Sequence, residues 1–178
     1  MAKDGSAKRE ETLSRSPTAM LKKDHKNVKD IFSKWEESDD ADECAELMEQ
    51  AILEIKVHAQ VEEEIFYPAA RDALDESELV DETQEEHHVV KMLIDEIEHL
   101  DADDSHMDAK FKVLMENVRH HIREEENDMF PKIDDEDFNN EIVQQMWERK
   151  QELTQEIGGV APTMTQGSDS QHAARSNR

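Results

Sequence analysis

HHIREEENDMFP, residues 120–131, is the stretch that decides the fold, because a helical pattern here carries histidine and glutamate where a buried stripe needs apolar residues. The same order of residue types occurs earlier, in HAQVEEEIFYP, residues 58–68. Each stretch has a histidine, a glutamate four residues later and a proline ten residues later, namely His58, Glu62 and Pro68, and His121, Glu125 and Pro131. Residues four apart lie on one face of a helix. The direction of that face decides whether these pairs meet water or the core.

The composition indicates one acidic domain. The chain has 178 residues, which is enough for a substantial core, and 21 basic against 46 acidic residues give a net charge of −25. Because this charge repels phosphate backbones and anionic lipids, we expect no nucleic-acid and no membrane partner. The single cysteine, Cys44, excludes an internal disulfide and fits a reducing compartment. The absence of an apolar signal segment or membrane-spanning run predicts a cytoplasmic protein.

The sequence predicts an all-α fold. No glycine occurs between residues 17 and 157, whereas hairpins need turn glycines and strands need β-branched runs. We expect helices over residues 17–38, 40–67, 77–101, 105–130 and 139–157. Short connections predict an antiparallel up-down-up-down four-helix bundle with an additional C-terminal helix, so that residues 17–157 form one domain. Residues 1–16 and 158–178 are polar, lack a stripe and are expected to be disordered tails.

Each of the first four helices has an apolar stripe with alternating steps of three and four residues, and each stripe contains one histidine. These are His25, His58, His87 and His121, and two of the stripes continue by one turn to Glu62 and Glu125. His88 and His120 share their faces with charged residues, so we expect them at the surface together with His99, His106 and His172. In the opening stretch, His121 and Glu125 are therefore predicted to point inward.

Two inward glutamates need a compensating charge. A lone histidine on an apolar stripe is usually a hydrogen-bonded core residue, and a run of glutamates is usually a solvated face. Glutamate is rarely buried alone, however, and two carboxylates in an apolar interior repel each other or take up protons. No Lys or Arg lies on the stripes of Glu62 and Glu125. A bound cation is the simplest compensation, and the predicted metal site consists of His25, His58, Glu62, His87, His121 and Glu125.

The donor types narrow the choice of metal. Mixed nitrogen and oxygen donors disfavour calcium and magnesium, and the lack of thiolates disfavours structural zinc and iron–sulfur clusters. Two carboxylates one turn from two imidazoles can bridge a pair of ions, and iron is the preferred metal. The His-x-x-x-Glu order differs from the Glu-x-x-His motif of ferritin-like bundles. No catalytic triad, phosphate loop or nucleotide fingerprint occurs, and Cys44 is expected to be a small core residue.

The segments DHKNVKDIF, HAQVEEEIFYP, EHHVVKMLIDEI and HHIREEENDMFP resemble the hemerythrin-like, or HHE cation-binding, family over residues 18–131. The resemblance implies a non-haem, oxo- or hydroxo-bridged di-iron centre in a four-helix bundle. It also implies that His25, His58, His87 and His121 are terminal ligands and that Glu62 and Glu125 are bridges. Oxygen-carrying members have a second histidine four residues further along their third helix, where this chain has Lys91. This departure argues against reversible O2 transport and leaves one iron with a different or open position.

Several functions fit a di-iron centre with an open position. The preferred prediction is a protein that binds O2 or NO, or that senses and handles iron and oxygen under oxidative stress. The enzymatic alternative is peroxide decomposition at the same centre, and the sequence leaves open whether the protein is an enzyme. The third alternative is a metal-free acidic bundle that acts through partners. We expect a monomer or weak homodimer, with the helix at 139–157 packed along the bundle or, alternatively, forming a dimer contact.

Overall fold

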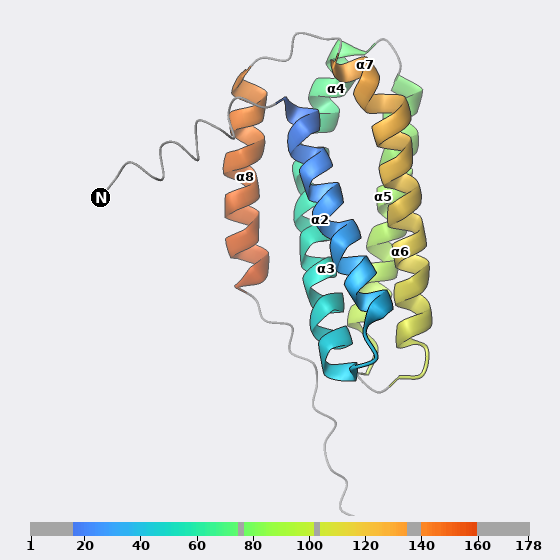
Figure 1. Cartoon of the computed structure of the whole chain (residues 1–178). Helices are drawn as coiled ribbons and strands as arrows, with labels where there is room; N and C mark the ends of the chain where they lie inside the picture. Colours follow the sequence, from blue (N-terminus) through green and yellow to red (C-terminus); the bar gives the residue numbers. More distant parts are fainter. Residues whose placement is uncertain (1–15, 75–76, 102–103, 135–139, 160–178) are drawn as a thin grey trace, which may run out of the picture.

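The fold is described by a computed structural model that covers residues 16–74, 77–101, 104–134 and 140–159. All regular secondary structure among these residues is helical, as predicted. Four long helices form the bundle: α2 (Pro17–Glu37), α3 (Ala41–Val61), α5 (Ser77–Glu98) and α6 (Met107–Glu124). They run in alternating directions along a common axis (Figure 1). Within the described part of the chain, no helix combines the length and the apolar character needed to cross a membrane.

The first two helices begin where side chains cap them. The Ser16 hydroxyl accepts a hydrogen bond from the Ala19 amide, and Pro17 occupies the first helical position of α2. Asp40 caps α3 in the same way, with its carboxylate 3.0 Å from the amide nitrogen of Glu43. Such caps satisfy amide groups that have no partner within the helix. The predicted N-terminus at Ser16 and Pro17 is therefore confirmed. The expected tails lie almost wholly outside the described residues.

The two glutamate-rich stretches do not end their helices at Tyr67 and Phe130, so this part of the prediction was wrong. Each stretch continues through a π-helical segment, η1 (Glu62–Phe66) and η2 (Glu125–Met129), into a short helix, α4 (Tyr67–Ala73) and α7 (Phe130–Asp134). Each proline is the second residue of its short helix, directly after the π-helical segment. π-Turns within helices are frequent at functional sites. Here each one begins at the glutamate of a His-x-x-x-Glu pair.

Two hydrophobic clusters fill the bundle. One contains Phe32, Trp35 and Phe111 and lies toward the ends of the helices where α2 leads into α3. The other contains Phe66 and Phe130 and lies toward α4 and α7. The histidines of the stripes lie between these clusters along each helix. The middle of the bundle is thus an enclosed, polar layer between two apolar ones.

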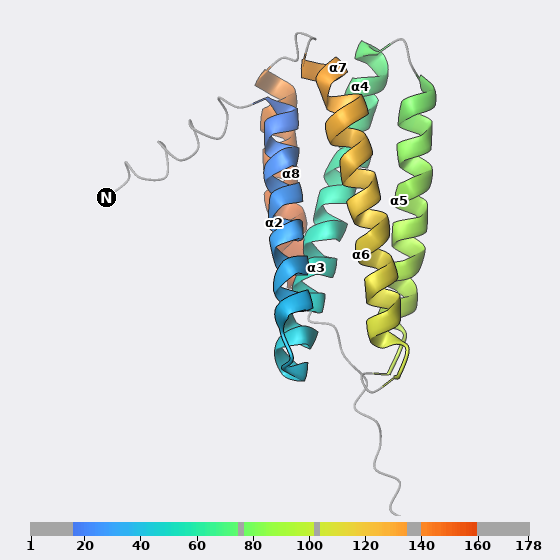
Figure 2. The same ribbon diagram turned by 45° about the vertical axis from the view of Figure 1, so that its right-hand side comes forward.

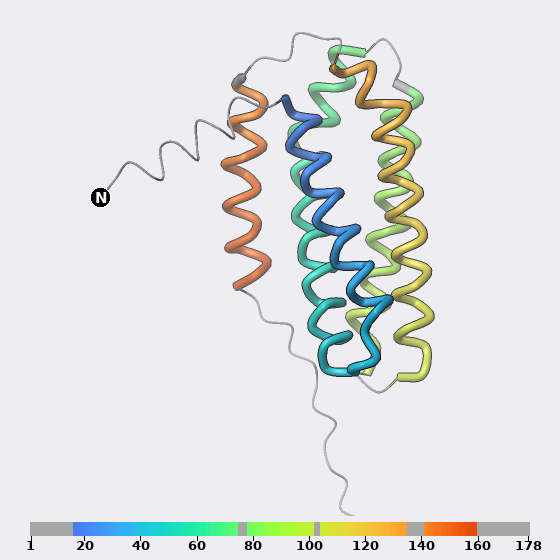
Figure 3. The backbone as a smooth tube through the Cα atoms, viewed as in Figure 1, coloured from blue at the N-terminus to red at the C-terminus, as the bar shows by residue number. Residues whose placement is uncertain are grey.

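The additional helix, α8 (Asn140–Gly158), packs along the outside of α3 and α2. Figures 1 and 3 show it beside these two helices, and Figure 2 shows α5 and α6 on the far side of the bundle. Met146 and Leu153 are buried in the second cluster, and Trp147 lies at the margin of the contact. This arrangement agrees with the prediction that the helix packs on its own bundle. It also makes the two sides of the bundle different.

Candidate metal centre

The structure brings all six predicted site residues to one level of the bundle, and all six are buried. They are His25 from α2, His58 from α3, Glu62 from η1, His87 from α5, His121 from α6 and Glu125 from η2. The neighbouring His88 and His120 are exposed, as predicted, and so are His99 and His106. His172 lies outside the described residues.

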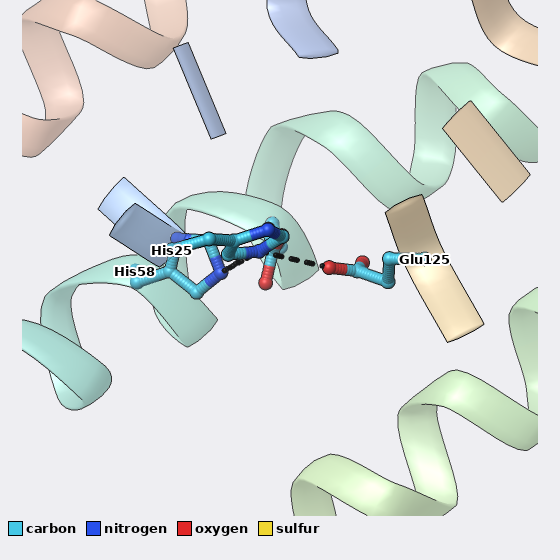
Figure 4. A group of neighbouring side chains, drawn as sticks. His25, His58 and Glu125 are labelled. Carbon is cyan, nitrogen blue, oxygen red and sulfur yellow. Dashed lines mark hydrogen bonds and ion pairs between the residues drawn. The ribbon is translucent and has the colours of Figure 1, made fainter. Parts of the chain in front are cut away.

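The first group of donor atoms comes from α2, α3 and the two π segments. His25 Nε2 lies 3.1 Å from His58 Nε2 and 3.2 Å from Glu125 Oε2. His58 Nε2 lies 3.1 Å from Glu62 Oε1. Figure 4 shows His25, His58 and Glu125 directed toward one another. Donor atoms of these four side chains all lie within 4.8 Å of one another, so the group could hold a cation.

The second group joins α5 and α6. His87 Nε2 lies 3.1 Å from His121 Nε2 and 3.3 Å from Glu62 Oε2, and these three side chains could hold another cation. Glu125 also reaches this side, because its Oε2 lies 3.4 Å from His121 Nε2. Glu62 thus directs one oxygen to each group of histidines, and Glu125 lies against both. Both carboxylates therefore lie between the two pairs of histidines.

One carboxylate oxygen of Glu62 and one of Glu125 lack a hydrogen bond among the described residues. Glu62 Oε1 and Glu125 Oε2 are buried and have no hydrogen-bond partner among the residues that the structure describes, although histidine nitrogens lie 3.1 Å and 3.2 Å away. The histidine nitrogens and carboxylate oxygens therefore point toward one common place without the alignment that a hydrogen bond needs. Because a buried oxygen without a partner costs free energy, an added cation has a physical role here. Imidazole and carboxylate donors suit iron and related transition metals.

In the metal-free protein, the histidines themselves supply positive charge. Burial lowers the pKa of His58, but the carboxylates of Glu62 and Asp24 outweigh burial and raise that pKa to about 10. Burial likewise lowers the pKa of His87, and Glu62 and Glu63 raise it to about 9. Burial also raises the pKa of Glu62, whereas His58 and His87 bring it well below its usual value. The buried stripes carry no Lys or Arg beside these glutamates, and their pairing with charged histidines was not predicted.

Two histidines direct their other ring nitrogen toward a carboxylate that the sequence analysis had placed in a solvated run. His25 Nδ1 lies 2.9 Å from Glu126 Oε1, and His87 Nδ1 lies 3.0 Å from Glu63 Oε1. A carboxylate behind a metal-binding histidine fixes its tautomer and ring orientation. Glu63 and Glu126 each directly follow the inward glutamate of their stretch. This repeated position in the sequence could have indicated that the two residues have the same role.

The other two histidines have acidic neighbours as well, at unequal distances. His121 Nδ1 lies 2.9 Å from Glu86 Oε2, which is a hydrogen-bonding distance. His58 Nδ1 lies 3.8 Å from Asp24 Oδ2 and makes no hydrogen bond. Asp24 and Glu86 each precede the inward histidine of their own helix by one residue. The sequence analysis assigned no role to either residue.

Tyr67 is a further site residue that was not predicted, because the expected helix ends at this residue. Its hydroxyl donates to Glu125 Oε1 at 2.9 Å and lies 3.1 Å from His87 Nε2. Burial and the charge of Glu125 raise the Tyr67 pKa well above its usual value, so the hydroxyl keeps its proton. The matching residue in the second stretch is Phe130, whose ring stacks on His25 with centroids 5.6 Å apart.

A small apolar cavity adjoins the four histidines. Its volume is about 20 Å³. A single water needs about 10–15 Å³ on the same measure. The cavity therefore has room for a ligand about the size of a water or a diatomic molecule. Aliphatic side chains make up the rest of its wall, namely Val28, Ile55, Ala59, Val90, Val118 and Ile122.

Comparison with known proteins defines the class. The hemerythrin HHE cation binding domain matches residues 16–133, so the chain belongs to this family of metal-binding helical bundles. The matched region ends before α8 begins.

Two relatives are similar to the chain. A protein from Nostoc sp., described as a DNA nickase, is 27% identical over 148 residues, which are 80% of this chain and 41% of that protein. An uncharacterised hemerythrin-like protein from Schizosaccharomyces pombe is 27% identical over 111 residues, 61% of this chain and 55% of that protein. The chain thus spans less than two thirds of either relative. No solved structure matches it significantly.

Proposed function

We propose that the protein holds two iron ions and binds a small ligand such as O2 or NO beside them. His25 and His58 would be terminal ligands of one ion and His87 and His121 of the other, with Glu62 and Glu125 as bridges. The observation that carries the proposal is the position of Glu62, whose two oxygens lie 3.1 Å from His58 Nε2 and 3.3 Å from His87 Nε2. Bound iron would supply coordination of O2 or NO and redox chemistry toward peroxide.

The two ion positions differ in their donors. The first donor group contains four side chains and the second contains three. Lys91, which stands where oxygen carriers have a fifth histidine, is 51% exposed and pairs with Glu63. The smaller donor group supports an open position on the His87 and His121 side.

The apolar cavity determines which ligands are admitted. Apart from the four histidines, the side chains that line it are aliphatic. Its small size supports a diatomic ligand or peroxide. A substitution that fills the cavity tests this directly. Ala59→Leu adds three carbons to the wall, whereas Ala109→Leu makes the same change at an exposed position.

The experiment loads the metal-free protein with Fe(II) under nitrogen, counts iron per chain and records the absorption spectrum after adding NO or O2. We expect about two irons in the original protein and in both variants. Ligand-dependent spectral changes should persist in Ala109→Leu and be lost or weakened in Ala59→Leu. An iron content near zero in the original protein would refute the proposal. Equal ligand responses in both variants would refute the role of the cavity.

Peroxide decomposition is the second candidate, and Tyr67 is the observation that favours it. Its protonated hydroxyl lies 2.9 Å from Glu125 and 3.1 Å from His87, so a proton donor is held beside the donor groups. Peroxide consumption by the iron-loaded protein separates the two candidates. Sustained turnover identifies an enzyme, and a single stoichiometric reaction identifies a binding or sensing protein.

A further inference from the structure

The metal centre consists of two similar halves that are offset by 62 or 63 residues in the chain. The structure places matching residues in matching roles. The pairs are His25 and His87, His58 and His121, Glu62 and Glu125, Glu126 and Glu63, and Lys29 and Lys91. Apart from the number of side chains in each donor group, four against three, a difference between the two halves can come from residues outside this repeat or from repeat positions where the residue types differ.

The acidic side chains next to the Nδ1 atoms of the histidines, together with the cations that pair with them, form the outer contacts of the centre. One pair of these outer contacts is the same in both halves. Glu63 lies behind His87 and pairs with Lys91. Glu126 lies behind His25 and pairs with Lys29 at 3.2 Å. The lysines lie on the equivalent helices α5 and α2, so the charge behind these histidines is balanced.

The other pair of outer contacts differs. Asp24, near His58, pairs with Lys150 from α8, and both side chains are largely buried, with 10% and 20% exposed. Glu86, behind His121, is approached instead by His120, whose Nε2 is 3.5 Å away and whose side chain is 55% exposed. The distances to the ring nitrogens follow this difference, at 3.8 Å for Asp24 and His58 and 2.9 Å for Glu86 and His121.

We propose that Lys150 is a positioning residue that makes the two cation positions unequal. Lys150 holds Asp24 Oδ1, and Asp24 Oδ2 stays 3.8 Å from the Nδ1 of His58, which has no hydrogen-bond partner among the described residues. A carboxylate at that nitrogen orients the ring and increases its basicity, and losing such a partner typically weakens metal binding about 10–100-fold. The His25–His58 position is then the weaker of the two, although four side chains offer it donors and three offer donors to the other position. The inference rests on the proposed dinuclear function.

Lys150 lies on α8, and this helix is outside the region matched by the family. The helix contributes a positive charge to the outer contacts of one half only, because it packs on α3 and α2 and not on α5 and α6. Removal of that charge favours a divalent cation nearby and frees Asp24 to approach His58. Lys150→Met should therefore strengthen the weaker position.

The test titrates the metal-free protein with Fe(II) under nitrogen by calorimetry, and records Mössbauer spectra after full loading. For the original protein we expect two binding steps of unequal affinity and two unequal doublets. In Lys150→Met the weaker step should tighten about 10-fold, the stronger step should not change, and the doublets should converge. Lys150→Arg should retain the original steps.

Arg149→Met is the matched control. Arg149 is the neighbouring residue on α8 and pairs with Glu64 at 2.6 Å, so its loss also weakens the docking of the helix but leaves Asp24 untouched. Its two binding steps should equal those of the original protein. Unchanged steps in Lys150→Met, or an equal shift in Arg149→Met, would overturn the role of Lys150 while leaving the dinuclear centre standing. A failure of the original protein to bind two ions would overturn both.

Discussion

Loading the metal-free protein with cations at pH 7 is expected to release about two protons per chain. The raised pKa values of His58, about 10, and His87, about 9, mean that both rings are protonated at pH 7 before metal is added. A metal binds the deprotonated ring, so each of these histidines must lose a proton. Glu62 contributes none, because its pKa lies well below the usual value and it is already ionised.

The pH dependence follows from the same two groups. Displacement of two protons makes the overall affinity for two cations rise about 100-fold per pH unit between pH 7 and 9. The dependence should flatten above pH 10, where both rings are neutral. In the metal-free protein both pKa values are raised above the unfolded value of 6.5. Their contribution to stability is therefore complete below pH 6.5 and is lost as pH rises through 9 and 10.

The assay is titration calorimetry at pH 7 in phosphate and in Tris, because these buffers differ in ionisation heat and the difference counts the protons. The melting temperature of the metal-free protein, measured from pH 6.5 to 10, should fall over the same range. His88→Gln is the control, since His88 is exposed and its loss should change neither result. Release of no protons, together with equal affinities at pH 7 and 8, would refute the charged state assigned to His58 and His87.

Three substitutions test individual residues of the site. His87→Ala should lose at least one iron and His88→Ala should keep both by metal analysis, because only His87 is buried; the reverse result would show that α5 is rotated. Tyr67→Phe should keep both irons, lower the free energy of unfolding by about 1–2 kcal/mol through loss of its hydrogen bonds, and slow any peroxide turnover. Glu62→Gln with Glu125→Gln should abolish two-iron binding and lower the melting temperature of the metal-free protein at pH 7, because the charged histidines lose their partners. A higher melting temperature would instead mean that the carboxylates are an uncompensated buried charge.

The bundle and the six inward residues could be predicted because helix periodicity is a local signal. Steps of three and four residues separate His87 from His88, and His121 from His120, without any knowledge of the neighbouring helices. The helix ends were harder. A proline ten residues after a histidine was interpreted as a stop, whereas Pro68 lies in the first turn of a short helix after a π segment. Periodicity cannot anticipate that change of winding.

The outer contacts could not be predicted, because they join residues that are far apart in the chain. Lys29 meets Glu126 and Lys150 meets Asp24 only after the helices pack. The position of Tyr67 depends equally on η1, since the wider turn determines where the first residue of α4 lies. Sequence patterns identified which faces are buried, but the contacts between faces required the three-dimensional arrangement.

The central claim is that the six inward residues hold two bridged iron ions. Anomalous diffraction at the iron edge, from crystals of the iron-loaded protein, tests it most directly. We expect two iron peaks, one beside His25 and His58 and one beside His87 and His121, with the carboxylates of Glu62 and Glu125 between them. A single peak on one histidine pair, or iron bound only at the protein surface, would contradict the claim.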